Sequence, residues 1–432
     1  MGIIGEAIET KKVGGELSPQ TIDAVVAGYT GGEVPDYQMA ALLMAIRLRG
    51  MTFAETVALT RAMADSGARY SFPDCVDKHS TGGVGDKLTM TALPLVAACG
   101  VPVAKLSGRG LGITGGTIDK LESIPGWSGD LSEPAFRAQV ARVGLVVASA
   151  GEVAPADKAI YALRDATGTV DSLPLIGSSI VSKKVATGAG HLLYDVKAGS
   201  GAFMKDAAAA RELADLLVRL SAALGVSAAA VITDMGTPLG AAVGNALEVR
   251  ESVAFLTGAP VPQDLAEVAR YEAAQLLRLH GAGDDADEQV LQAWRSGAGY
   301  EAFAAFVHAQ GGQVAALSNL SVSSTVTEVT APQAGQVQGI DALAVARASL
   351  VLGAGRQRKE DAIDPGAGVL LRVRVGDRVE RADPVATLYG VREVDAAREL
   401  VLGGLRLGEQ PASPVPHLID TVGIDTVGPA RD

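Results

Sequence analysis

The chain has 432 residues, more than one ordinary hydrophobic core accommodates, so we expect two to three domains. Hydrophobic residues make up 48% and charged residues 20%, which is typical of a globular protein with ample core material. A formal net charge of −12 argues against a nucleic-acid partner. Two cysteines, Cys75 and Cys99, are too few for a disulfide framework or a metal cluster, and neither a signal peptide nor a bilayer-spanning run is visible. These features predict a cytoplasmic protein that does not bind membranes.

The first 67 residues have the pattern of a small helical lobe. Apolar residues at helical spacing predict helices over about 19–29, 35–49 and 53–66. Ser18 is a suitable N-cap for the first of them, and Thr52 with Glu55 has the form of a capping box for the third. We expect this lobe to span residues 1–67 and to be completed by about 157–190.

After Pro73 the pattern changes to alternating strands and helices. Apolar runs typical of buried parallel strands stand at 101–104, 144–148, 192–196 and 229–233, and helical patterns separate them at 88–99, 134–143 and 207–224. This alternation predicts an α/β domain over 68–156 and 191–330, with helices covering a central sheet. Its strands run into glycine-rich loops, where α/β folds bind their ligands.

The last hundred residues predict a C-terminal α+β domain over 331–432. Residues 325–329 alternate, and 369–375 followed by 376–379 reads as strands joined by a tight turn. We interpret the basic run 355–359 as a solvated loop. The predicted fold class is therefore α/β, with a small all-helical lobe, a larger mixed α/β lobe around a central sheet, and a C-terminal α+β domain.

The run KHSTGGVGDK at 78–87 is the strongest candidate for an anion site. Its glycines allow several backbone N–H groups to converge just before a predicted helix. Ser80 and Thr81 add hydroxyl donors, and Lys78 adds positive charge. A nucleotide P-loop is excluded, because Asp86 and Lys87 stand where that motif requires Gly-Lys-Ser/Thr.

A second glycine-rich run, KLSGRGLGITGGT at 105–117, follows the next predicted strand. Gly110, Gly112 and Gly115 match the dinucleotide fingerprint formally, but Asp119 and Glu122 come too early to bind a ribose. Two such loops on successive connections indicate one anion gripped from both sides. An NAD-binding oxidoreductase remains a more distant alternative.

A third constellation lies farther along the chain. If 174–187 is a helix, Ser179 and Lys183 lie one turn apart on the same face. With Arg164 across a cleft, this trio has the donors and acceptors to bind a planar heterocycle. A solvated helix surface explains the same spacing equally well.

Together these motifs resemble the family of thymidine and pyrimidine-nucleoside phosphorylases. The likeness extends over nearly the whole chain and includes KHSTGGVGDK, KLSGRGLGITGGTIDKLES, YALRD, SSIVSKK, DVKAGSGAFMK and PLGAAVGNALEVRE. The resemblance implies reversible phosphorolysis of pyrimidine (deoxy)nucleosides to free base and (deoxy)ribose 1-phosphate, with thymidine, uridine and deoxyuridine as candidate substrates. It also implies inorganic phosphate as co-substrate, no organic cofactor, and a homodimer formed through the N-terminal helices.

The resemblance further implies roles for individual residues. Phosphate would be held by Lys78, Ser80, Thr89, Lys105, Ser107 and Thr117. The pyrimidine would be bound by Arg164, Ser179 and Lys183, with Tyr161 and Ile180 packing around it. Phosphate attacks C1′ of the sugar as the bond to the base breaks, and His79, Arg164 and Lys183 would act as the catalytic residues by stabilising the anionic leaving base.

Two positions depart from the family pattern. The resemblance implies a potassium ion near Gly85, position 87, Leu239, Ala242 and Glu251, but position 87 is Lys here, where some members have Thr. An ammonium group beside a monovalent cation puts that site in doubt. Ile113 stands where members usually carry His, so a hydrogen bond from that position is lost.

Two further alternatives stay open. A phosphoribosyltransferase of the anthranilate type shares the helical-plus-α/β plan, although it needs acidic residues for magnesium and pyrophosphate. A binding protein without catalysis is harder to reconcile with base and phosphate residues on separate lobes.

Overall fold

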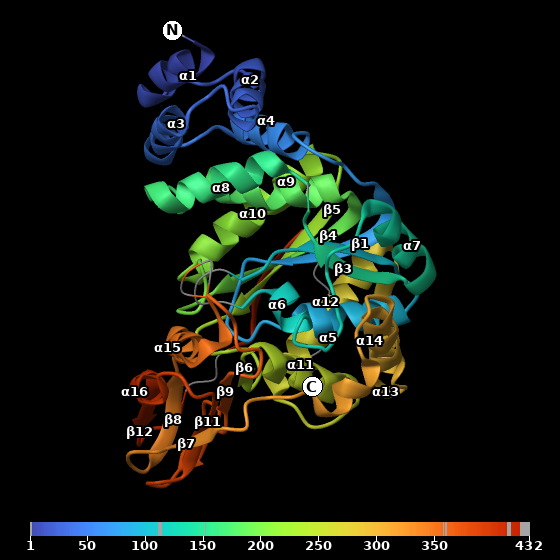
Figure 1. Ribbon diagram of the computed structural model, residues 1–432, viewed down its shortest axis with the longest axis vertical. Coiled ribbons are helices and arrows are strands. Elements are labelled where there is room, and N and C mark those ends of the chain that lie inside the picture. The colour runs from blue at the N-terminus through green and yellow to red at the C-terminus, as the bar shows by residue number, and fades with distance from the viewer. Residues whose placement is uncertain are drawn as a thin grey trace.

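Three parts of the molecule follow one another along its long axis (Figure 1). The computed structural model describes residues 2–110, 115–151, 153–356, 358, 361–412 and 416–423. A helical lobe lies at the N-terminal end, an α/β domain in the middle, and a domain of strands and short helices at the opposite end. The predicted fold class is confirmed, whereas the residue boundaries of the domains stay predictions. Within the described residues no helix is long and apolar enough to cross a membrane.

The helical lobe combines the N-terminal helices with two helices from the middle of the chain. They are α1 Ile3–Lys12, α2 Pro19–Thr30, α3 Asp36–Arg49, α4 Phe53–Ala64, α8 Pro155–Thr167 and α9 Leu173–Thr187. The first of these precedes the three predicted helices. Ser18 caps α2, and Thr52 with Glu55 forms the predicted capping box of α4. Ile160 of α8 and Leu175 of α9 belong to the same apolar core as the N-terminal helices.

The central sheet is parallel except at one edge. Its described strands are β1 Phe72–Ser80, β2 Val103–Ser107, β3 Leu145–Ser149, β4 Ala189–Ala198, β5 Ser227–Asp234 and β13 Leu418–Val422, in the order β13-β5-β4-β1-β2-β3. β13 pairs antiparallel with β5, so the chain returns to this sheet although the predicted C-terminal domain included the segment. The sequence pattern does not predict β1 and favours a loop for Lys78, His79 and Ser80. They are the last residues of this strand.

Helices cover both faces of the sheet. They are α5 Leu88–Ala98, α6 Thr117–Leu121, α7 Glu133–Val143, α10 Ala207–Ala223, α11 Asn245–Leu256, α12 Gln263–His280, α13 Ala286–Arg295 and α14 Ala298–Ala309, with short 3-10 turns at Gly283–Asp285 and Val314–Asn319. Successive strand residues point to opposite faces, so Val146 packs toward α9 and α10 while Val147 packs toward α5 and α14. Val181 and Val185 place α9 in the sheet's core as well as in the lobe, so α9 connects the two.

The C-terminal domain is built from two small antiparallel sheets. Its elements are β7 Val326–Thr330, β8 Gly335–Ile340, α15 Ala342–Ser349, a π-helical turn Leu350–Ala354, β9 Gly368–Leu371, β10 Arg378–Val379, β11 Pro384–Tyr389, α16 Val394–Gly404 and β12 Leu405–Gly408. One sheet has the order β10-β8-β12, and the other has the order β6-β9-β11-β7, where β6 Ala242–Val243 comes from the α/β domain. The predicted strands near 369–375 and 379 therefore belong to different sheets.

Candidate functional site

A cleft of about 470 Å³ lies between the carboxyl ends of β1 and β2 and the helices α8 and α9. Two glycine-rich segments form one side of it, and residues of α8 and α9 form the other. Its lining includes His79, Ser80, Gly82, Gly83, Asp86, Thr89, Lys105, Ser107, Gly110, Gly116, Thr117, Asp157, Lys158, Tyr161, Lys183, Lys184 and Thr187. Segments more than a hundred residues apart in the sequence thus meet where α/β folds bind ligands.

The first glycine-rich segment turns sharply from β1 into α5. Gly82 and Gly85 have φ angles of +95° and +70°, a region that favours glycine. A Cβ atom on Gly83 would lie 2.7 Å from the end of the Met235 side chain, so a larger residue here would require Met235 to shift. The Ser80 hydroxyl accepts a hydrogen bond of 3.2 Å from the Gly82 amide. Because α5 begins here and Thr89 of its first turn lines the cleft, the positive end of the helix dipole favours an anion at this point.

Lys78 lies beneath this segment in a network of buried charges. Its Nζ is 3.0 Å from Asp195 Oδ2 and 3.4 Å from Glu272 Oε2. Burial alone would lower the pKa of Lys78, but Asp195, Asp86 and Glu272 raise it well above its usual range. Burial and the neighbouring Asp195 charge raise the pKa of Glu272 well above its usual range. Lys78 is 1% exposed and does not line the cleft.

The second glycine-rich segment follows β2 and ends at the start of α6. Lys105 Nζ donates to the Lys78 carbonyl and lies 3.5 Å from Asp77 Oδ1. Burial and repulsion from Lys184 lower the pKa of Lys105 to about 7. Ser107 and Thr117 stand at the two ends of the segment, and both line the cleft. Ile113 lies outside the described residues.

A carboxylate from α6 holds this second segment in shape. Asp119 Oδ2 accepts a 2.6 Å hydrogen bond from the Gly110 amide, and its Oδ1 is 3.7 Å from Arg109 and 3.0 Å from Arg356. Arg356 comes from the basic run that we interpreted as solvated, yet its side chain is only 19% exposed. The interpretation is wrong for Arg356, which reaches from the C-terminal domain to Asp119, the residue that holds the second glycine-rich segment.

His79 lines the cleft at the end of β1. Its ring packs edge-on toward Tyr194, with the ring centroids 6.2 Å apart. Burial and the nearby lysines Lys184, Lys105 and Lys183 hold the pKa of His79 well below its usual range. The imidazole is therefore neutral near pH 7, with one donor and one acceptor nitrogen.

The opposite side of the cleft carries Lys183 and Tyr161. Lys183 Nζ is 2.5 Å from Asp157 Oδ2 and 3.1 Å from Ser179 Oγ. The helix expected over 174–187 is observed as α9, and it places Ser179 and Lys183 on one face as predicted. Tyr161 is 37% exposed and lines the cleft.

Arg164 does not line the cleft, although its guanidinium lies 5.8 Å from the ring centroid of Tyr161, which does. It is 1% exposed and donates to the backbone carbonyls of Thr169, Val170 and Leu175. Three of its five N–H donors thus fix the turn between α8 and α9. Gly168 begins this turn with a φ of +67°, which explains why glycine suits the position.

Comparison with known proteins identifies the family. Residues 5–67 match the model described as "Glycosyl transferase family, helical bundle domain", and residues 72–300 match "Glycosyl transferase family, a/b domain". Residues 336–403 match "Pyrimidine nucleoside phosphorylase C-terminal domain". The thymidine phosphorylase of Mycobacterium tuberculosis (strain ATCC 25618 / H37Rv) is 48% identical over 421 residues, 96% of this chain and 97% of the relative. The chain belongs to the thymidine and pyrimidine-nucleoside phosphorylase family.

Other relatives agree with this assignment. The pyrimidine-nucleoside phosphorylase of Bacillus subtilis (strain 168) is 45% identical over 95% of this chain and 97% of its own length. The pyrimidine-nucleoside phosphorylase of Geobacillus stearothermophilus is 43% identical over 96% of this chain and 98% of its own length. The crystal structure of anthranilate phosphoribosyltransferase from Thermus thermophilus has a TM-score of 0.57, is 20% identical, and covers 70% of this chain and 99% of its own. That likeness shows a shared fold alone, so the phosphoribosyltransferase alternative has no support beyond the fold.

The cleft brings together most of the residues that the family resemblance singled out. His79, Ser80, Thr89, Lys105, Ser107, Thr117, Tyr161 and Lys183 line it, whereas Lys78, Arg164, Ser179 and Ile180 do not. The sequence analysis missed Asp157 and Lys184, which also line it. Lys184 Nζ bonds Asp77 Oδ2 at 2.7 Å and the Leu106 carbonyl at 3.1 Å. Its place next to Lys183 in SSIVSKK was the available signal.

The residues implied for potassium also converge, but around an ammonium group. Lys87 Nζ donates to the Leu239 carbonyl at 2.7 Å and lies 2.9 Å from Glu251 Oε2. Cβ atoms built on Gly85 and Gly240 would lie 3.2 and 3.0 Å from it. These oxygens suit a cation, but Lys87 supplies one, so the set does not fit an additional potassium ion.

Proposed function

We propose that this chain catalyses the reversible phosphorolysis of pyrimidine nucleosides, giving the free base and a pentose 1-phosphate. The observation that supports it best is the one cleft that the two glycine-rich segments share with Tyr161 and Lys183. Relatives of 43–48% identity over nearly the whole chain are thymidine and pyrimidine-nucleoside phosphorylases. Inorganic phosphate is the proposed co-substrate, with no organic cofactor.

The two glycine segments would hold phosphate as nucleophile. Ser80, Thr89, Ser107 and Thr117 offer hydroxyl donors, and Lys105 offers charge that binding of an anion reinforces. Lys78 would act from below, through the network with Asp195 that fixes the end of β1. A phosphate oxygen so placed attacks C1′ as the bond to the base breaks.

The helical side would hold the base. Lys183, already hydrogen-bonded to Ser179, supplies positive charge for the anionic leaving base, and neutral His79 supplies a hydrogen bond. Tyr161 and Ile180 would pack around the ring. Arg164 would have to release the Val170 and Leu175 carbonyls, within its own lobe, before it contacts the base. We also propose that the two lobes close, because the base and phosphate residues lie on opposite sides of the cleft.

We also propose a homodimer that forms through the N-terminal helices. Several large apolar side chains are exposed on or beside α1 and α3: Ile3, Val13, Tyr37, Met44 and Leu48. Val13, Tyr37 and Leu48 are each more than 70% exposed, and a self-complementary interface would bury them. A cytoplasmic location stays a prediction from composition.

The experiment that tests the function compares base release from thymidine, uridine and deoxyuridine with and without phosphate. Release that requires phosphate and yields a pentose 1-phosphate is expected. Release without phosphate, or none with it, would overturn the proposal. Lys183→Ala should lose turnover by about 10²-fold or more while phosphate binding persists. Arg378→Ala, on β10 where the side chain is 79% exposed, is the control and should behave as wild type.

A further inference from the structure

The most unusual feature outside the cleft is the buried ammonium of Lys87. Lys87 precedes α5 and is 1% exposed. Its Nζ donates to the Leu239 carbonyl at 2.7 Å and forms a 2.9 Å ion pair with Glu251 Oε2. It therefore joins the end of the first glycine segment to the loop 239–242 and to α11.

The space around this ammonium is closed by backbone. A Cβ atom at Gly85 would lie 2.6 Å from the Leu239 carbonyl oxygen and 3.2 Å from that of Ala242. One at Gly240 would lie 2.6 Å from Glu251 Oε2. Both glycines have positive φ, +70° and +71°. Two carbonyl oxygens and a carboxylate thus face the same small volume as the Lys87 Nζ, and such oxygens are the ligands that hard cations take.

The carboxylate of this cluster is held independently of the lysine. Glu251 Oε1 accepts from the Ala241 amide at 2.7 Å, and Oε2 accepts from the Ala242 amide at 3.1 Å. Glu251 is therefore a fixed negative charge on α11, and removing the ammonium would leave it buried without a counter-charge. A second cation beside the same oxygens would be repelled by Lys87.

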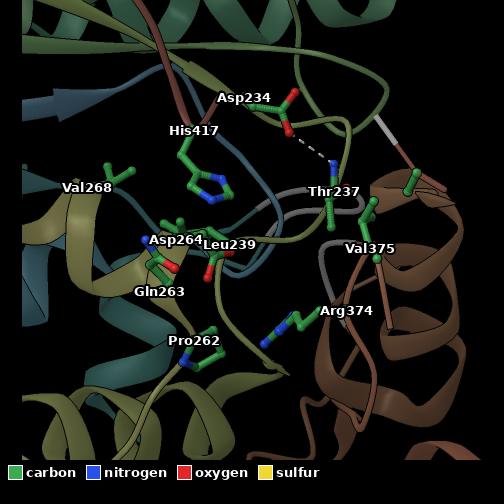
Figure 2. Close-up of a pocket in the computed structure, with 12 residues that line it drawn as sticks. Asp234, Thr237, Leu239, Pro262, Gln263, Asp264, Val268, Arg374, Val375 and His417 are labelled. Carbon is green, nitrogen blue, oxygen red and sulfur yellow. Dashed lines mark hydrogen bonds between the residues drawn. The ribbon is translucent and has the colours of Figure 1, made fainter. Parts of the chain in front are cut away.

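The same loop is anchored from its other side. The Gly240 amide donates to Asp264 Oδ2 at 3.0 Å, and its carbonyl accepts from Arg374 Nη1 at 2.8 Å. Asp264, Leu239 and Arg374 line the second pocket shown in Figure 2, between the α/β domain and the C-terminal domain. The loop 239–242 is thus held by Asp264 and Arg374 at Gly240 and by the Lys87 ammonium at Leu239. Lys87 belongs to the first glycine-rich segment, which the proposed function assigns to phosphate.

We propose that Lys87 is a built-in cation that takes the place of a bound potassium ion, so that this chain orders its phosphate segment without any monovalent metal. The proposal rests on the proposed function only for the identity of the anion. The ordering itself is a property of the folded chain, and it predicts stability and turnover that are indifferent to potassium.

The test measures Tm and phosphate-dependent turnover in potassium chloride and in tetramethylammonium chloride at equal ionic strength. The wild type should show the same Tm and rate in both salts. Lys87→Thr should lose about 3–5 °C in tetramethylammonium, because Glu251 is left without its partner, and should recover most of this loss as potassium saturates. Crystals of the variant soaked in thallium(I) should show anomalous density among Leu239, Ala242 and Glu251, and wild-type crystals should not.

Lys120→Thr is the matched control. Lys120 is also buried. Its Nζ lies 2.7 Å from Glu248 Oε2 on α11, the helix that carries Glu251, and it donates to the Asp86 carbonyl at 2.6 Å. It should lose stability without recovery by potassium. A saturable, potassium-specific rise in wild-type Tm overturns the proposal, even if Lys87→Thr fails to fold. A folded Lys87→Thr variant whose Tm does not respond to potassium overturns it too. Tm is measured without any catalytic reaction, so either result can be told apart from failure of the proposed function.

Discussion

Lys105 should make anion binding fall steeply with rising pH. The pKa of Lys105 is lowered to about 7 by burial and by Lys184, so the free enzyme loses this charge just above neutrality. A bound dianion stabilises the protonated form and raises the pKa, so binding takes up a proton. The apparent affinity is reduced by the fraction of enzyme that is protonated, which is about 10% at pH 8 and about 1% at pH 9. Affinity should therefore weaken about 10-fold at pH 8 and about 100-fold at pH 9 relative to pH 6.

Calorimetry with sulfate tests this, because sulfate keeps its double charge over the whole range while phosphate does not. Titrations in buffers of different ionisation enthalpy should show about 0.5 proton taken up at pH 7 and about 0.9 at pH 8. In Lys105→Arg the side chain stays charged, so the pH dependence should disappear. Lys184→Met removes the strongest nearby repulsion and should shift the fall to higher pH. Sulfate affinity that is flat from pH 6 to 9 in the wild type, or equally steep in Lys105→Arg, would refute the reasoning.

Three further outcomes are expected. Because burial and Asp195 raise the pKa of Glu272 and so favour its neutral form, Glu272→Gln should change the free energy of unfolding in urea by no more than about 1 kcal/mol, whereas Asp195→Asn should cost about 3–5 kcal/mol by removing the carboxylate that both Lys78 and Lys197 contact; equal costs would contradict this. Leu48→Glu on α3 should convert the proposed dimer to a monomer in light scattering, and a wild type that is already monomeric would exclude that interface. Arg356→Ala should raise the KM for phosphate about 10-fold, because Asp119 loses a partner in the second glycine segment, and an unchanged KM would limit this contact to the C-terminal domain.

The sequence predicted the parts of the site that depend on local pattern. Glycine runs, helical spacing and capping residues singled out both glycine-rich segments and placed Ser179 and Lys183 on one face of α9. Their meeting in one cleft followed from the rule that ligands bind at the carboxyl ends of parallel strands. Family resemblance supplied the rest of the residue set.

What the sequence could not predict depends on pairings between distant segments. Lys78 is turned away from the cleft because Asp195, 117 residues later, and Glu272 on α12 lie beneath it. β1 was missed because its buried end contains Asp77 and Lys78, and this breaks the apolar run expected of a central strand. Arg164 likewise bonds carbonyls whose position depends on how α8 turns into α9.

The C-terminal domain contacts residues that support each of the two glycine-rich segments. Arg356 bonds Asp119, which holds the Gly110 amide of the second glycine segment. Arg374 donates to the Gly240 carbonyl. Gly240 lies in the loop 239–242, which Lys87 links to the end of the first glycine-rich segment. Both contacts restrain backbone next to a glycine-rich segment, so losing them would shift the amides of these segments. Replacing both Arg356 and Arg374 by Ala should therefore weaken phosphate binding more than base binding, because the proposed base side is built from α8 and α9 in the helical lobe.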